Sequence, residues 1–238
     1  MKRLTVILLL LFSLSPLCAQ QYKDGGELVN DMYKRYKDNF YKTLTFSQKI
    51  INFRGDSIVS EDIMHEAYMS PSFLILKFTS WESGNGLIFR NDSLYTIENG
   101  LLKDKKSLTH DLLILGLDMY NCNPEVTLSR LQRAGYDYSK IQEGRYRNQD
   151  VWIVGDQSSK SFYVDKISLL FVRMQDKMGR SVDFLNYQLF NNKPVATHIL
   201  FYNKLGKLYM EEIYFDVKVD AQIGSEIFNP GNFVQSRW

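Results

Sequence analysis

The side chains of this chain that are best suited to chemistry are three histidines, two cysteines and several carboxylates. His65, His110 and His198 each stand without a second histidine or cysteine at the spacing of a zinc site. The sequence also has no Gly-x-Ser-x-Gly elbow and no glycine-rich phosphate loop. We therefore expect a non-catalytic protein with no cofactor, although an enzyme whose site is assembled from distant residues is a third possibility.

The most prominent carboxylates are adjacent in sequence, as Glu61-Asp62 and Glu211-Glu212. Successive side chains of a strand point to opposite faces, so the two members of a pair cannot converge on one substrate. We interpret both pairs as parts of solvated strand edges. His198 lies among apolar residues, which indicates a hydrogen-bonded histidine in the core or at its rim.

The first residues have the pattern of a secretory signal. Lys2 and Arg3 precede the apolar run 4–14, and Ser-Pro-Leu-Cys-Ala follows at 15–19, with the small residue Ala19 at the expected cut. The run is shorter than the roughly 20 residues of a membrane span. We expect cleavage after Ala19, a periplasmic location, and one domain over residues 20–238.

Two alternatives to cleavage after Ala19 are open. The segment would stay attached as an N-terminal anchor, or Cys18 would be the acylated residue of a lipoprotein. Pro16 and Leu17 fit the second alternative poorly, because an acylation site favours small residues there.

Charge and cysteine content exclude some partners. Removal of Lys2 and Arg3 leaves 27 basic and 27 acidic residues and no long basic run, so we expect no nucleic-acid partner. Cleavage also leaves Cys122 as the one cysteine, which excludes an internal disulfide. We expect Cys122 to be a small residue at a helix end, and the protein to be a monomer.

Most of the chain has the pattern of β-strands. Ile213, Phe215, Val217 and Val219 alternate with polar or amphipathic residues, which predicts that these four face the interior. Strands in series without crossover helices indicate an antiparallel sheet. The expected strands are 44–53, 58–69, 71–81, 86–89, 94–97, 151–154, 161–164, 167–174, 182–190, 196–202 and 208–219.

Three segments have helical patterns. Apolar residues recur at helical spacing over 27–40, and residues 107–120 are rich in leucine. The third helix has Asn123 as its cap, Pro124 in its first turn and Gly135 at its end. The two later helices form an insert between halves of the sheet, as either a movable lid or a permanent part of the core.

Four short motifs, in order, resemble a known family. They are Thr-Phe-Ser-Gln-Lys at 45–49, Pro-Ser-Phe at 71–73, Val-Trp-Ile-Val at 151–154 followed by Phe-Tyr-Val-Asp-Lys at 162–166, and Ser-Glu-Ile-Phe-Asn-Pro at 225–230. With the order of signal, helix, strands, helical insert and strands, they resemble the LolA-like periplasmic lipoprotein carriers, a superfamily that includes lipid-sensing domains of the RseB type.

The resemblance implies a mainly β (α+β) fold, an open, curved antiparallel half-barrel closed by an N-terminal helix and a short helical insert. It also implies binding of lipid or lipoprotein acyl chains, and exchange with a membrane-bound donor or acceptor protein. One feature departs from the family. The carrier has an Arg-Trp pair after the strand-opening Phe, whereas Phe73 is followed here by Leu-Ile-Leu, with Lys77 as the nearest cation.

Two functions from different classes follow. In the first, an apolar concavity holds acyl chains, since each buried methylene stabilises by roughly 0.8 kcal/mol. In the second, the concavity is filled by the protein's own helices, and the domain binds a protein partner through an edge strand. For the carrier we expect the lipid-binding residues to be Leu74, Leu76, Phe78, Leu170, Val172 and Phe215, covered by Leu112, Leu113 and Leu117.

Overall fold

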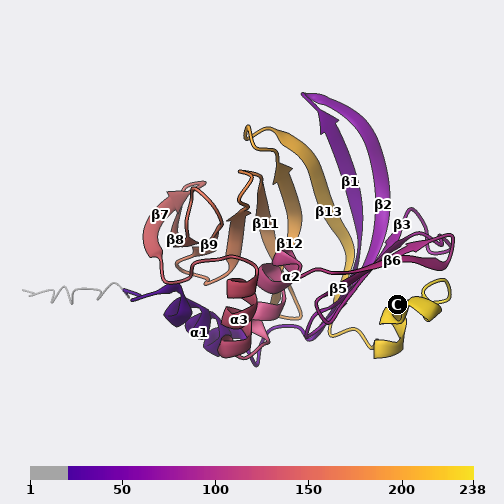
Figure 1. The fold of residues 1–238 in the computed structure, drawn as a ribbon, viewed down its shortest axis with the longest axis horizontal. Coiled ribbons are helices and arrows are strands. Elements are labelled where there is room, and N and C mark those ends of the chain that lie inside the picture. Colours follow the sequence, from indigo (N-terminus) through magenta and orange to yellow (C-terminus); the bar gives the residue numbers. More distant parts are fainter. Residues whose placement is uncertain (1–20) are drawn as a thin grey trace, which may run out of the picture.

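The computed structural model of the protein describes residues 21–238, so the expected signal peptide and its cleavage site lie outside the described residues. The described part is one large sheet with a group of helices against it (Figure 1). In chain order the elements are α1 (Gly25–Tyr36), β1 (Thr43–Arg54), β2 (Ser57–Met69), β3 (Phe73–Phe78), β4 (Gly86–Arg90), β5 (Ser93–Glu98), β6 (Leu101–Ser107), α2 (Asp111–Gly116), the 3-10 turn η1 (Asp118–Tyr120), α3 (Pro124–Arg133), β7 (Ile141–Tyr146), β8 (Gln149–Gly155), β9 (Ser161–Asp165), β10 (Phe171–Gln175), β11 (Ser181–Phe190), β12 (Lys193–Tyr202), β13 (Leu208–Val219), η2 (Ser225–Phe228) and η3 (Pro230–Asn232).

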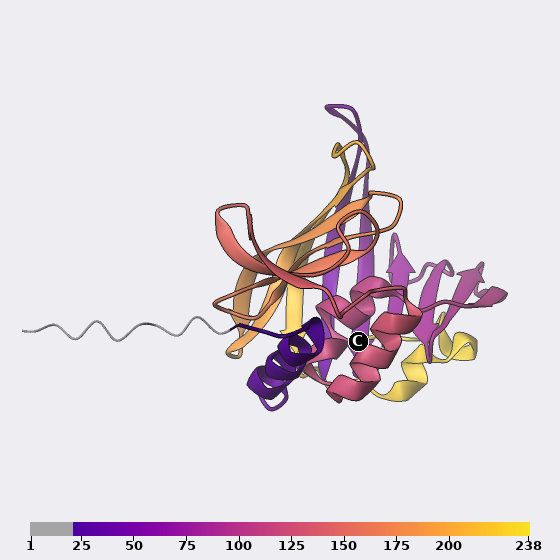
Figure 2. The same cartoon turned by 60° about the vertical axis from the view of Figure 1, so that its left-hand side comes forward.

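All strands belong to one antiparallel sheet, in the order β6-β5-β4-β3-β2-β1-β13-β12-β11-β10-β9-β8-β7. The first and last strands of the chain, β1 and β13, pair in the middle of this sheet. Its edges, β6 and β7, do not pair with each other, so the sheet is an open half-barrel rather than a closed barrel. Figure 2 shows its curvature and the helices gathered at its base. This is the mainly β, open architecture predicted from the sequence.

Tight turns join neighbouring strands where the sequence predicts them. Asn91 and Asp92, both at positive φ, connect β4 to β5, and Gly55, at φ +63°, connects β1 to β2. Asn, Asp and Gly tolerate this left-handed region better than other residues do. Short connections of this kind explain why successive strands are neighbours in the sheet.

The helices begin at polar caps. The Asp24 side chain accepts hydrogen bonds from the backbone N–H groups of Gly26 and Glu27 at the start of α1. Asn123 caps α3 in the same way, with Pro124 in the first turn, as predicted.

The segment 107–120 was predicted to be one helix, but only α2 and the turn η1 are helical in it. Residue 107 instead ends strand β6, which the prediction missed. Strand β7 also lacks the alternation that would have predicted it.

A buried ion pair fixes the helices to the sheet. Asp118 in η1 is fully buried and accepts hydrogen bonds from Tyr68 Oη (2.9 Å), Ser72 N (3.0 Å) and Ser72 Oγ (2.9 Å). Arg130 in α3 donates to Asp118 Oδ2 at 2.5 Å and also reaches Asp92. One carboxylate thus connects η1 and α3 to β2 and the turn before β3.

The C-terminal segment covers the outer face of β2–β5 (Figure 1, yellow). Phe228 and Phe233 are buried there against Ile75 and Ile88. Lys77 is fully buried under the same segment, and its Nζ donates to Trp81 O (2.9 Å) and Val234 O (3.1 Å). The outer face of these strands is therefore covered where the segment lies.

The prediction that Ile213 and Phe215 of β13 face the interior is wrong. Ile213 and Phe215 are 39% and 40% exposed and lie on the outer face. The residue between them, Tyr214, faces inward and stacks on Phe46 with ring centroids 4.1 Å apart. Alternation alone cannot distinguish the inner face when aromatic residues occupy both sets of positions.

A β-bulge then reverses the alternation of β13. The pairing with β1 shifts register between Thr45 and Ser47, and Asp216 opposite has φ +52°. An extra residue in one strand moves all later side chains to the other face. Val219 is consequently buried in the main core, as predicted, and Val217 packs against that core.

Candidate ligand-binding site

A cavity of about 210 Å³ lies between α2 and the concave face of the sheet. Its wall comes from β1–β4 on one side and β11–β13 on the other, and it is predominantly apolar. Figure 1 shows α2 in front of the concave face. The two halves of the sheet are thus brought together around one space.

Five of the predicted site residues line this cavity. Leu74 and Leu76 come from β3, and Leu112, Leu113 and Leu117 come from α2 and the residue after it. Leu113 is almost completely buried, whereas Leu112 and Leu117 are half-buried. The structure therefore places the helical insert over the leucines of β3.

Four predicted residues do not line the cavity. Phe78, at the end of β3, lies beyond it, and Leu170 packs in the main core instead. Val172 belongs to an outer cluster that includes Val151, because the pairing of β9 and β10 shifts register between Phe171 and Arg173. Phe215 is on the outer face for the reason given above. The prediction is wrong for these four as lining residues.

The sequence prediction missed the wall contributed by the later strands. Phe184 and Tyr187 of β11, Phe201 of β12 and Met210 and Tyr214 of β13 complete the apolar lining. Their signal was the abundance of aromatic residues, but sequence alone does not show which of them face the same side. Only the order of strands in the sheet decides this.

Two carboxyl side chains interrupt the apolar wall. Glu66 on β2 is 6% exposed, and its Oε1 accepts a hydrogen bond from Gln48 Nε2 at 2.7 Å. Burial, and then the charge of Glu212, raise the pKa of Glu66 well above its usual value. Gln48 is buried too, and its carbonyl oxygen Oε1 has no hydrogen-bond partner among the described residues.

The second carboxyl is Glu212 on β13. Burial raises its pKa from 4.5 to about 8. Its neighbour Glu211 faces the other way, where its carboxylate pairs with His198 Nε2. The adjacent glutamates thus face opposite sides, as predicted, but the interpretation of both as a solvated edge is wrong for Glu212.

Among the described residues, no lysine or arginine side chain lines the cavity to balance the charge of these carboxyls. The one basic side chain that lines the cavity within residues 21–238 is His110. Its Nδ1 accepts a hydrogen bond from Leu113 N at the start of α2, and burial lowers its pKa, so the ring is neutral. Lys77, the cation nearest to the position of the family's arginine, points to the outer face beneath the C-terminal segment.

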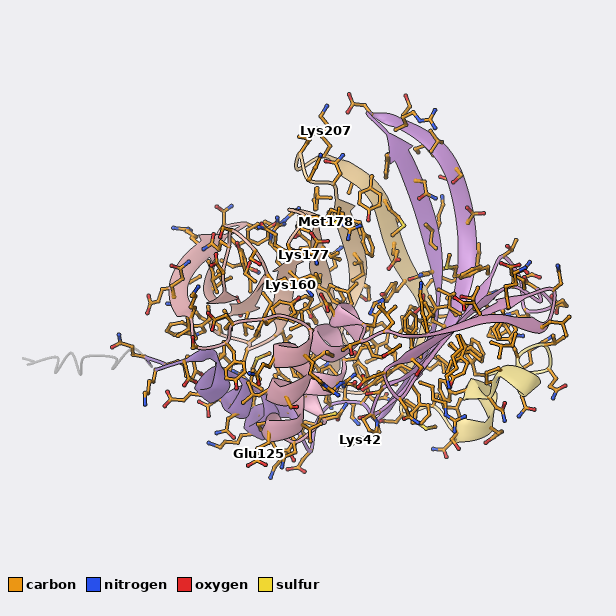
Figure 3. The ribbon with its side chains drawn as sticks, viewed as in Figure 1. Lys42, Glu125, Lys160, Lys177, Met178 and Lys207 are labelled. Carbon is orange, nitrogen blue, oxygen red and sulfur yellow. The ribbon has the colours of Figure 1, made fainter. Side chains whose placement is uncertain are left out.

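Polar contacts hold α2 over the cavity. Lys160 Nζ donates to Asp111 Oδ2 at 2.6 Å and to Ala134 O at 2.7 Å. Figure 3 shows Lys160 close to the Lys177-Met178 turn between β10 and β11, beside α2. The wall is close to the helix as well, because a Cβ on Gly116 would come within 2.8 Å of the Phe184 ring. These contacts keep α2 against the inner face.

A second cleft, of about 340 Å³, lies on the outer face and includes Phe215. Within it, His65 Nδ1 lies 2.8 Å from Ser47 Oγ, and the His65 ring stacks on Trp81. Within residues 21–238 the other ring nitrogen of His65 has no hydrogen bond to a carboxylate, so the arrangement of a catalytic triad is absent there.

Other reactive groups offer no chemistry in the described residues. Burial raises the pKa of the Cys122 thiol to about 12, and this cysteine lies at the junction of η1 and α3, as expected of a helix-end residue. Residues 21–238 contain no group of three His, Cys, Asp or Glu side chains placed to hold a metal ion. Within the same residues, no helix has the length and apolarity needed to cross a membrane.

The structure is similar to several solved proteins. A putative outer membrane lipoprotein-sorting protein domain from Vibrio parahaemolyticus matches with a TM-score of 0.58 and 15% identity, covering 89% of this chain and 98% of that one. A DUF1329 family protein from Desulfovibrio piger matches with a TM-score of 0.57 and 11% identity, covering 86% and 95%. A LolA superfamily protein from Nitrosomonas europaea matches with a TM-score of 0.52 and 13% identity, covering 86% and 97%.

Sequence comparison finds no such match, because no protein-family model and no curated protein matches the chain. The similarity is therefore one of fold, and it agrees with the resemblance of the short sequence motifs. The chain has the open half-barrel fold of LolA-like and lipoprotein-sorting proteins.

Proposed function

We propose that the protein is a non-catalytic periplasmic carrier that binds the acyl chain of a lipid or lipoprotein in the cavity beneath α2. The observation that carries this proposal is the unfilled apolar space between α2 and the sheet. A domain whose own helices filled its concavity would leave no such space. The fold shared with a lipoprotein-sorting domain supports the same function.

The cavity is large enough for part of a chain. Its volume of about 210 Å³ exceeds the roughly 150 Å³ of an apolar cavity that takes up benzene, but it is below the roughly 300 Å³ at which ordinary ligand sites begin. A long acyl chain therefore needs α2 to move outward or has to leave through the open side. The short α2 is held by the Lys160–Asp111 ion pair and by the buried side chains of Ile114 and Leu115, so such a movement has to break these contacts.

A fluorescent fatty-acid probe tests the proposal. We expect saturable binding to the mature protein, weakened several-fold by Leu76→Trp, because the larger side chain fills the cavity. Ile213→Trp, an equal change on the exposed outer face, is the matched control and should leave binding unchanged. If the wild-type protein takes up no lipid probe, the carrier function fails and the protein-binding alternative gains.

The location is tested separately. We propose that the exported protein begins at Gln20, after cleavage behind Ala19, and that residues 20–238 are a single domain. Intact-mass measurement of the exported protein should give that mass. A diacylglycerol adduct on Cys18 would instead show a membrane-anchored lipoprotein.

A further inference from the structure

Three side chains with hydrogen-bond acceptors lie on neighbouring strands at the concave face. Glu66 and Glu212 lie on the two strands that flank β1, and Gln48 lies on β1 between them. Gln48 pairs directly with Tyr214, a residue of the cavity wall, so its side chain is on the concave face as well. The Gln48 amide nitrogen already donates to Glu66 Oε1, which leaves the Gln48 carbonyl oxygen, Glu66 Oε2 and the Glu212 carboxyl oxygens without a hydrogen bond among the described residues.

The two carboxyls have no cationic partner among residues 21–238. Neither Glu66 nor Glu212 forms an ion pair with a residue of the described chain. Buried carboxyls without a cation are costly when ionised and accept a proton or a cation instead. An apolar cavity with two carboxyls in its wall, and the buried Gln48 carbonyl oxygen beside them, has the complementary chemistry of a hydrocarbon chain that ends in a donor.

We propose that the preferred ligand of this cavity is an amphiphile with one alkyl chain and a primary ammonium head group, bound by Glu66, Glu212 and Gln48. This inference rests on the proposed carrier function and names its ligand class. The ammonium group donates to the carboxylates and to the Gln48 carbonyl oxygen, and the chain lies against Leu74, Leu76 and α2. A primary ammonium has three donors, which is the number of these acceptor side chains.

Binding of the cation displaces a proton. The ligand's positive charge favours the ionised carboxylates, so a carboxyl that is protonated in the empty cavity releases its proton to the solvent on binding. The other titratable groups that face the pair are Tyr214 on β13, Tyr187 on β11, Tyr41 before β1 and His110 before α2. Burial raises the pKa of each tyrosine and lowers that of His110, so all four stay neutral near pH 7.

The test compares three ligands of equal chain length. Dodecylamine, dodecanol and dodecanoic acid compete with the neutral dye Nile red at pH 7, below their micelle-forming concentrations. We expect dodecylamine to bind at least about tenfold more tightly than dodecanol, which corresponds to about 1.4 kcal/mol, and dodecanoic acid to bind more weakly than dodecanol. Calorimetry in buffers of different ionisation enthalpy should show proton release for the amine and none for the alcohol.

Isosteric variants locate the effect. Glu66→Gln with Glu212→Gln should abolish the preference for the amine while Nile red and dodecanol still bind. Glu61→Gln is the matched control, because Glu61 is on the same strand but pairs with Lys49 on the outer face. It should keep the preference.

The outcomes separate the two proposals. Equal binding of amine and alcohol, or amine binding without proton release, overturns the ammonium site and leaves the carrier standing. Failure of all ligands and of Nile red to bind overturns the carrier itself. The proton-release measurement uses the wild-type protein, so it decides the matter even where the double variant fails to fold.

Discussion

The carboxyl of Glu212 in the cavity wall should make the empty protein less stable as the pH rises. Its pKa is about 8 in the folded protein and 4.5 in an ordinary environment. Between these two pH values the folded state holds a proton that the unfolded state has released. The free energy of unfolding therefore falls as the pH rises from about 4.5 to about 8.

The size of this effect follows from the two pKa values. A difference of about 3.5 pH units, at about 1.4 kcal/mol per unit, sets an upper bound of ~5 kcal/mol. Glu212 is only partly buried, so water in the cavity reduces the penalty, and we expect about 1–3 kcal/mol. Glu66 acts in the same direction, because its pKa is raised as well.

Urea denaturation of the delipidated protein at pH 5 and pH 8 measures this linkage. Glu212→Gln should be more stable than the wild type at pH 8 by the amount above and similar to it at pH 5. Glu61→Gln should follow the wild type at both pH values, since Glu61 is exposed. If Glu212→Gln lowers stability at pH 8, or leaves the pH dependence of the wild type unchanged, the reasoning is refuted.

Three further predictions follow from contacts elsewhere in the fold. Arg130→Ala should lower the free energy of unfolding by about 3–5 kcal/mol in chemical denaturation, because it leaves the buried Asp118 carboxylate without its cation. Arg133→Ala, on the surface of the same helix, should lower it by less than about 1 kcal/mol. Tyr214→Asp should lower the melting temperature much more than Phe215→Asp, and the reverse order would mean that the faces of β13 are inverted. Cys122 should resist a thiol reagent at pH 8 until the protein is unfolded, and fast labelling of the native protein would contradict its burial.

The sequence was sufficient for the class of fold because its signals were local. Turn residues such as Asn91-Asp92 and the cap at Asn123 are each decided by neighbours in the chain. Strand β6 was missed for the opposite reason. All its side chains are exposed, so no hydrophobic period marks it, and only its pairing with β5 makes it a strand.

The candidate site was predictable only in part, because it depends on register. Leu74 and Leu76 were found, since the even positions of β3 are apolar while Lys77 occupies an odd one. Phe215 and Val172 were misplaced, because register shifts in the pairing of β13 and of β10 change which face a residue occupies. Such shifts arise from pairing across the sheet, so they cannot be predicted from the residues of one strand alone.

Glu66 and Glu212 are carboxyl side chains in a cavity wall that is otherwise predominantly apolar. Apolar side chains at both positions would cost nothing in burial and would enlarge the apolar surface available to an acyl chain. Both carboxyls instead lie on the strands flanking β1, the most extensively paired part of the sheet, where their positions are well fixed. A local rule that is broken inside a cavity marks a functional position more often than a structural one. The cost in stability at pH 8 and the preference for an ammonium ligand therefore have one cause, and an ammonium ligand that binds Glu212 should remove much of the pH dependence seen in the empty protein.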